Sequence, residues 1–206
     1  MASELLAAVE QRYGFCLPDL YQWFSAAGHF DHSGNACLAL TDVEWLRPQE
    51  IASYKFLEWQ APHKTWFVPF AISARRDEWG WRLDWAVDGK PPVVFCERGP
   101  EGYGYAPDFR GFLYRMLLEE FSGSWLLEHE GDEVGRQAVA RSVEFVLPHL
   151  PKPWAARLET LAQKPWRSKD NYIGVYSRSE CKQIIAIDLA FPYLNEKFWQ
   201  EEPLKP

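Results

Sequence analysis

The chain has 206 residues, of which 47% are hydrophobic and 25% are charged. This composition is typical of a globular protein and excludes a disordered or fibrous chain. Because 29 acidic residues outnumber 22 basic ones, the net charge is −7, so nucleic acid and anionic membrane surfaces are unfavourable partners.

The N-terminal segment predicts two antiparallel helices. Apolar residues recur at helical spacing over residues 3–13, and Gly14 is placed to end that helix. A second apolar stripe runs over residues 18–27, begins with a proline suited to the first helical turn, and stops before Gly28.

The middle of the chain predicts a β-sheet. We expect a buried strand at residues 36–41 and a short helical or turn segment at residues 42–53. Three β-rich runs follow, separated by polar turns, as in an antiparallel meander; they are residues 66–73, 79–86 and 91–97.

The second of these runs is predicted to have one packed face and one wet face. Alternation along an extended strand places Trp79, Trp81, Leu83 and Trp85 on one side. The same alternation places Glu78, Arg82 and Asp84 on the other side. We expect the tryptophan side to pack and the charged side to face water.

Residues 109–121 predict a helix that covers the sheet, and Gly123 is placed to terminate it. Residues 1–125 should therefore form one α+β domain, with an N-terminal helix pair, an antiparallel meander and a covering helix. Residues 126–206 should be an appendage packed on the same domain. It is expected to contain two helices, separated by prolines, and a hairpin formed by residues 171–177 and 182–191.

The order of these segments resembles the SUKH superfamily, which includes bacterial toxin-immunity proteins and Smi/Knr-type fungal regulators. The matching residues are Leu17, Pro18, Tyr21, Phe24, Pro69, Phe70, Ala71, Asp84, Phe109, Phe112 and Leu113. The resemblance spans about residues 3 to 121 and departs from the family pattern at residues 74–78. It implies a SUKH-like α+β fold and a non-catalytic protein that binds a partner.

Signals for export, membrane insertion and metal binding are missing from the sequence. The N-terminus lacks a basic start followed by an apolar run, and no apolar stretch reaches the ~18 residues of a membrane span, so we expect a soluble cytoplasmic protein. The four cysteines have no C-x-x-C spacing and are expected to be buried free thiols. His29, Asp31 and His32 could begin a metal site, but no second ligand cluster follows, so a solvated turn is favoured and no metal or cofactor is expected.

No nucleophile, phosphate-loop or dinucleotide motif is present, so we expect no catalytic residues and no enzyme activity. The candidate partner-binding residues combine acidic groups with tryptophans; they are Asp77, Glu78, Trp79, Trp81, Asp84 and Asp88. A solvated sheet face and a core tryptophan stripe are the alternative interpretations of the same residues.

Two functions are compatible with these residues. The first is an immunity protein that neutralises a cognate bacterial toxin domain by direct binding, with a basic toxin surface attracted by the negative charge. The alternative is a regulatory or scaffold module that holds a peptide or small ligand in an aromatic groove.

Overall fold

The computed structural model describes residues 2–30, 43–56, 66–98, 101–123, 132–169 and 172–199. The chain divides into two compact units. The sheet unit comprises Met1–Gly34, Asp42–Phe109 and Phe191–Pro206, and the helical unit comprises Asn35–Thr41 and Arg110–Ala190. The predicted α+β class is confirmed, but the division differs from the expected boundary at residue 125 because the last segment of the chain belongs to the sheet unit.

The predicted N-terminal helices are present as α1 (Ala2–Tyr13) and α2 (Asp19–Ala26). Gly14 follows α1 at a φ of 68°, a left-handed conformation that glycine adopts without strain. The segment expected to be helical or a turn forms β1 (Glu44–Trp45) and α3 (Pro48–Ala52). Arg12 fastens α1 to the end of α3 by donating to the carbonyls of Ile51, Ala52 and Tyr54. The strand expected at residues 36–41 lies outside the described residues.

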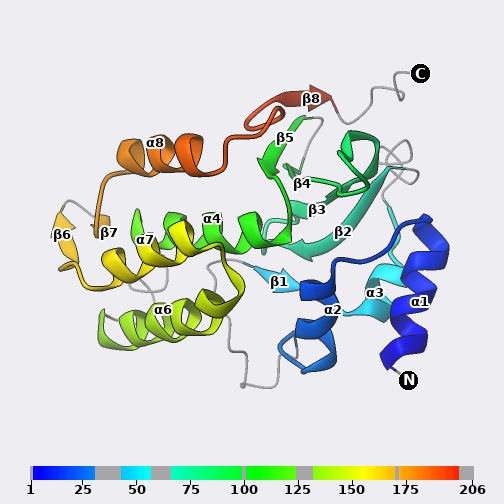
Figure 1. Cartoon of the computed structure of the whole chain (residues 1–206), viewed down its shortest axis with the longest axis horizontal. Helices are drawn as coiled ribbons and strands as arrows, with labels where there is room; N and C mark the ends of the chain where they lie inside the picture. Colours follow the sequence, from blue (N-terminus) through cyan, green and yellow to red (C-terminus); the bar gives the residue numbers. More distant parts are fainter. Residues whose placement is uncertain are drawn as a thin grey trace. The chain divides into compact units, whose positions relative to one another are not determined.

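The sheet has the strand order β1-β2-β3-β4-β5-β8, and neighbouring strands are antiparallel (Figure 1). Its remaining strands are β2 (Phe67–Ile72), β3 (Glu78–Arg82), β4 (Val93–Cys96), β5 (Glu101–Ala106) and β8 (Lys197–Trp199). The meander β2 to β4 agrees with the prediction. No strand was predicted at β5, because Gly102 and Gly104 interrupt its apolar alternation.

Both faces of β3 are buried or nearly so, so the prediction of a wet face for this run is wrong for Glu78 and Arg82. On the first face, Trp81 packs against Tyr21 of α2 and against Phe70 and Phe109. The second face carries a separate apolar cluster; its buried members are Trp66, Phe67, Val94, Cys96 and Phe198. The charged residues of β3 point toward this second cluster rather than toward water.

The second predicted run, residues 79–86, forms a shorter strand than expected. Strand β3 ends at Arg82, and residues Leu83–Trp85 form a 3-10 turn, η2. The Leu83 N–H still donates to the Trp66 carbonyl at 2.7 Å. Leu83 and Trp85 therefore do not continue the tryptophan stripe of β3, and Trp85 packs against the second-face cluster instead.

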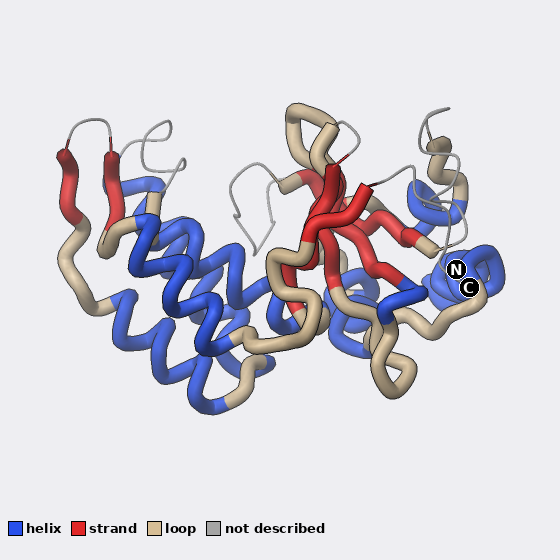
Figure 2. The backbone as a smooth tube through the Cα atoms, turned by 90° about the horizontal axis from the view of Figure 1, so that it is seen from above, coloured by secondary structure: helices blue, strands red, loops and turns tan. Residues whose placement is uncertain are grey.

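The described part of the helical unit contains four α-helices and a small two-stranded hairpin (Figures 1 and 2). They are α4 (Phe109–Phe121), α6 (Asp132–Val146), α7 (Lys152–Ala162), α8 (Arg178–Asp188), β6 (Arg167–Lys169) and β7 (Tyr172–Gly174). The three predicted helices α4, α6 and α7 are present. Asp188 joins three of the elements, because it accepts hydrogen bonds from Tyr114 of α4 and Arg157 of α7.

Helix α4 lies at the division between the two units of the chain. Only its first residue, Phe109, belongs to the sheet unit, where its ring contacts Tyr21, Phe70 and Trp81. From Arg110 onward the helix belongs to the helical unit.

The predicted C-terminal hairpin is wrong. Strand β7 pairs with β6, which precedes it, and most of the run 182–191 lies in α8. Ser177 caps α8 because its hydroxyl accepts a hydrogen bond from the Glu180 N–H. In return, the Glu180 carboxylate accepts a hydrogen bond from the Ser177 N–H. Cys181, Ile185 and Leu189 then repeat every four residues and are all buried, which is a helical rather than an alternating pattern.

Candidate partner-binding surface

Three of the six predicted partner-binding residues belong to the core. Exposure is 4% for Glu78, 7% for Trp79 and 0% for Trp81. Trp81 lies beneath α2, and Trp79 packs against Phe95 of the neighbouring strand. Their expected contact with a partner is therefore corrected: these side chains are enclosed by their own chain.

Glu78 contributes to the packing of the sheet unit. The Tyr54 hydroxyl donates to Glu78 Oε1, which fastens the segment after α3 to the sheet. Burial raises the pKa of Tyr54, and the negative charge of Glu78 raises it further. Burial is also the main cause that raises the pKa of Tyr13 to about 12, with Arg12 opposing the shift and Glu78 adding to it.

Asp77 holds the turn between β2 and β3. One carboxylate oxygen accepts from the Ser73 hydroxyl at 2.9 Å, and the other accepts from the Arg98 N–H at 2.9 Å. Asp77 is only partly exposed. Both of its oxygens therefore have partners within the sheet unit, as expected of a residue that stabilises a turn.

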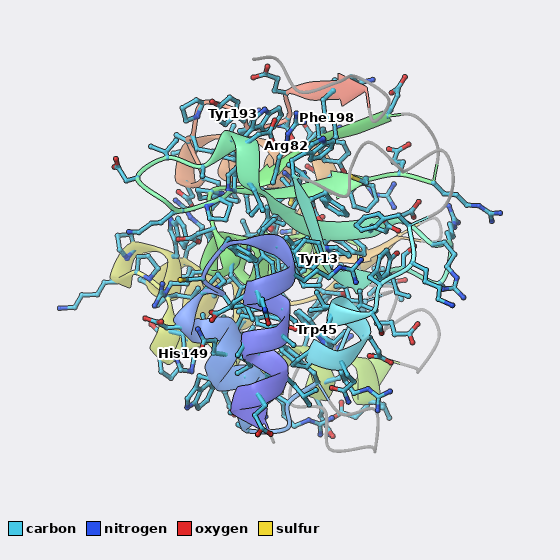
Figure 3. The ribbon with its side chains drawn as sticks, turned by 90° about the vertical axis from the view of Figure 1, so that its right-hand side faces the viewer. Tyr13, Trp45, Arg82, His149, Tyr193 and Phe198 are labelled. Atoms are coloured by element: carbon cyan, nitrogen blue, oxygen red, sulfur yellow. The ribbon has the colours of Figure 1, made fainter. Side chains whose placement is uncertain are left out.

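Arg82 lies in a cage of aromatic rings, which we call the arginine cage. Its guanidinium carbon is 4.5 Å from the ring centre of Trp66, 3.8 Å from that of Trp85 and 4.2 Å from that of Phe198. Figure 3 shows Arg82 beside Tyr193 and Phe198. The side chain is 12% exposed, and a cation shielded from water in this way interacts strongly with ring faces.

Asp84 completes the arginine cage. It accepts from Arg82 Nε at 3.0 Å and from Arg82 Nη2 at 3.2 Å, the two-bond geometry that makes arginine–carboxylate pairs specific. The Asp84 side chain is 24% exposed. Asp84 therefore forms an ion pair with Arg82 and also reaches the protein surface.

Residues 83–90 form a projecting loop, the 83–90 hairpin, that begins at the arginine cage. Val87 and Lys90 exchange two backbone hydrogen bonds, of 3.2 and 3.0 Å. Between them Asp88 and Gly89 have φ values of 50° and 73°, which is the pattern of a two-residue type I′ turn. Val87 is 55% exposed at this turn, and Asp88 is exposed as well.

The structure thus brings together Asp84 and Asp88 of the predicted site and separates them from Glu78, Trp79 and Trp81. The candidate surface that remains consists of the exposed Val87, which lies between Asp84 and Asp88 in the sequence of the 83–90 hairpin. The Asp88-Gly89 dipeptide could have indicated this hairpin from sequence. Nothing in the sequence pointed to Tyr193 or Phe198, because they lie more than a hundred residues farther along the chain.

The prediction that the cysteines are buried free thiols is confirmed for two of the cysteines that the structure describes. Cys96 and Cys181 are buried free thiols, and burial is the main cause that raises the pKa of each. Cys16 is exposed, because it lies in the short connection between α1 and α2. Cys37 lies outside the described residues.

Comparison of the chain with known protein families, characterised proteins and solved structures gives no match. The resemblance to the SUKH superfamily therefore stays a prediction. Among the described residues, no helix has the length and apolar character needed to span a membrane. Within those residues no three His, Cys, Asp or Glu side chains are grouped as metal ligands; Asp31 and His32 of the histidine turn lie outside them.

Proposed function

We propose that the chain is a non-catalytic protein-binding module, that the 83–90 hairpin is its contact surface, and that it acts as an immunity protein against a bacterial toxin domain. The observation that carries the contact surface is the exposed Val87 flanked by Asp84 and Asp88 on a turn held at its base by the arginine cage. An exposed apolar side chain with charged neighbours on a preorganised loop can bind a partner with little loss of conformational freedom. The immunity role rests on the resemblance to the SUKH superfamily.

The proposed partner presents a basic surface. The chain carries a net charge of −7, and a negative field accelerates the approach of a positively charged protein. Within the hairpin, Asp88 supplies this attraction more effectively than Asp84, since the charge of Asp84 is balanced by Arg82.

The alternative of an aromatic ligand groove loses its expected residues, because Trp79 and Trp81 are in the core. A cavity of about 120 Å³ is lined by Leu5 of α1, by Phe30, which follows α2, and by Arg47, which precedes α3. Typical small-molecule sites enclose roughly 300–1,000 Å³. The size of this cavity therefore does not favour the small-ligand function.

The immunity role predicts a toxin domain encoded beside this protein's gene, and binding kinetics with that domain test the proposal. Asp88→Asn should lower the association rate about 2- to 5-fold at low salt, because it removes one steering charge at a position where asparagine tolerates the left-handed backbone. Val87→Ser should accelerate dissociation about 5-fold, because it removes an apolar side chain that the bound partner would cover. The association rate of the natural protein should fall as salt increases.

Glu159→Gln is the matched control, because it removes one exposed charge from α7 in the helical unit. It should leave the kinetics nearly unchanged. If Asp88→Asn and Val87→Ser behave like this control, the contact surface lies elsewhere. If the toxin domain does not bind the natural protein, the immunity role is wrong.

A further inference from the structure

The last described segment of the chain, residues 191–199, lies along the sheet and is called the strap. The Gly104 N–H donates to the Glu196 carbonyl at 3.0 Å, and the Asn195 N–H donates to the Gly104 carbonyl at 2.8 Å. A Cβ atom built on Gly104 would be only 1.9 Å from the Tyr193 carbonyl oxygen. The strap is therefore seated on β5 by main-chain hydrogen bonds at a position where only glycine leaves room.

Two aromatic rings of the strap contact the base of the 83–90 hairpin. Tyr193 stacks on Trp85, with ring centres 4.4 Å apart and planes inclined by 17°. Phe198 forms one wall of the arginine cage and lies edge-on to Trp85, with ring centres 5.4 Å apart. The hairpin base is thus enclosed by rings from a segment distant in sequence.

The hairpin has few stabilising contacts of its own. The turn η2 at its start has no buried residue. Beyond it, one backbone hydrogen bond joins Ala86 to Leu83, and two join Val87 to Lys90. The base of the hairpin is joined to the sheet, since the Leu83 N–H donates to the Trp66 carbonyl and the Arg82 N–H donates to the Pro92 carbonyl. The tip beyond Leu83 has only the few bonds above, so its conformation depends on the side-chain contacts that Arg82 and Trp85 make at the base.

We propose that the strap positions the 83–90 hairpin for partner binding, with Tyr193 and Phe198 as positioning residues that act through Trp85 and Arg82. This inference rests on the proposed function of the hairpin. When the strap is seated, the hairpin is held in one conformation and little ordering is needed on binding. When the strap contacts are weakened, the hairpin samples other conformations and the competent fraction falls.

Hydrogen exchange of the full chain tests the positioning without any partner. Tyr193→Ala should accelerate exchange of the Val87 and Lys90 amides about 3- to 10-fold, the effect expected for loss of one aromatic stacking contact. Tyr193→Phe keeps the ring and should restore slow exchange. Trp23→Ala removes a ring that is 46% exposed on α2 and should leave the hairpin amides unchanged.

Two results would overturn the inference. One is unchanged exchange at Val87 and Lys90 in Tyr193→Ala. The other is equal acceleration in β2, β3 and β4, which would show that the variant loosens the whole sheet unit rather than the hairpin.

Binding measurements separate this inference from the proposed function. With the toxin domain, Tyr193→Ala should weaken affinity by about the factor by which it accelerates hairpin exchange. Faster exchange with unchanged affinity would overturn the role of the strap in binding. If Val87→Ser and Asp88→Asn leave binding unchanged, the proposed contact surface fails, whereas the exchange measurement still decides whether the strap positions the hairpin.

Discussion

Glycines in the sheet allow aromatic rings to lie directly on the strands. A Cβ atom at Gly80 would be 2.4 Å from Phe67 Cε2 and 2.5 Å from the Val68 carbonyl oxygen. A Cβ atom at Gly102 would be 2.4 Å from Phe198 Cζ. The missing side chains are thus the reason that the second face of the sheet holds a dense aromatic cluster.

Gly80→Ala should destabilise the sheet unit by at least about 2 kcal/mol, because the added methyl group overlaps both a ring and a carbonyl that cannot move independently. Chemical denaturation followed by tryptophan fluorescence measures this loss. Gly89→Asn is the control, since nothing lies within 4 Å of its Cβ position and its φ of 73° suits asparagine. Equal stability of Gly80→Ala and the natural protein would show that β2 and β3 are not packed in this way.

Ionisation of Tyr13 should make the stability of the protein depend on pH in the alkaline range. Its pKa is raised from the ordinary value of 10.0 to about 12, so the folded state favours the neutral phenol. The stabilisation is fully present below pH 10 and is lost as pH rises from 10 toward 12. Tyr13→Phe should therefore lose less stability than the natural protein over this interval.

Urea denaturation at several pH values between 8.5 and 11.5 measures this difference, and absorbance at 295 nm follows ionisation of the phenols. The pKa of other tyrosines, such as the partly buried Tyr54, is also raised in the folded protein. Tyr13→Phe should therefore still lose some stability as pH rises. Identical slopes in the two proteins would contradict the assignment to Tyr13.

At the scale of elements, strong periodic patterns predicted the structure and weak ones did not. The stripes of α1, α2 and α4 and the runs of β2 and β4 are long or strongly apolar, so local sequence was sufficient. The predicted hairpin after residue 171 failed because Ile184 and Ile185 favour strands locally, whereas the cap at Ser177 and the burial of Ile185 and Leu189 favour a helix. Tertiary burial decided between the two.

The cap of α8 is directly testable. Ser177→Ala should destabilise the helical unit by about 1 kcal/mol, because the Glu180 N–H loses its side-chain acceptor. Ser177→Thr retains a hydroxyl acceptor and should cost less. Thermal denaturation together with amide exchange of α8 provides the measurement, and unaltered protection at the start of α8 in Ser177→Ala would show that the cap is unimportant.

At the scale of the whole molecule, the sequence predicted the class of fold, and two of the predicted site residues, Asp84 and Asp88, lie on the surface that we propose. Asp84 and Asp88 could be found because a cluster of carboxylates is visible locally. The packing of their hairpin could not be found, since Trp66 lies far in sequence from Tyr193 and Phe198 and no local pattern joins them. Likewise, β8 has only three residues, too few to show a clear strand period.

Phe198 tests whether the C-terminal segment is part of the sheet unit. Its side chain is 7% exposed and packs in the cluster with Trp66 and Phe67, against Gly102 and the Arg82 guanidinium. Phe198→Ala should therefore destabilise the sheet unit by about 3–4 kcal/mol, as large cavities in a core do. Phe198→Leu fills part of the space and should lose less.

Native-state exchange of the amides in β3, β4 and β5 is the appropriate measurement, because it reports on the sheet unit separately from α6 and α7. Ile187→Ala is the control: this apolar residue is 73% exposed on α8, so its truncation should change stability by no more than about 0.5 kcal/mol. Loss of protection in β3 to β5 alone would show that residues 191–199 stabilise the sheet unit. Protection that persists in Phe198→Ala would instead favour a boundary near residue 125, because a self-sufficient N-terminal domain would not need a ring supplied from the end of the chain.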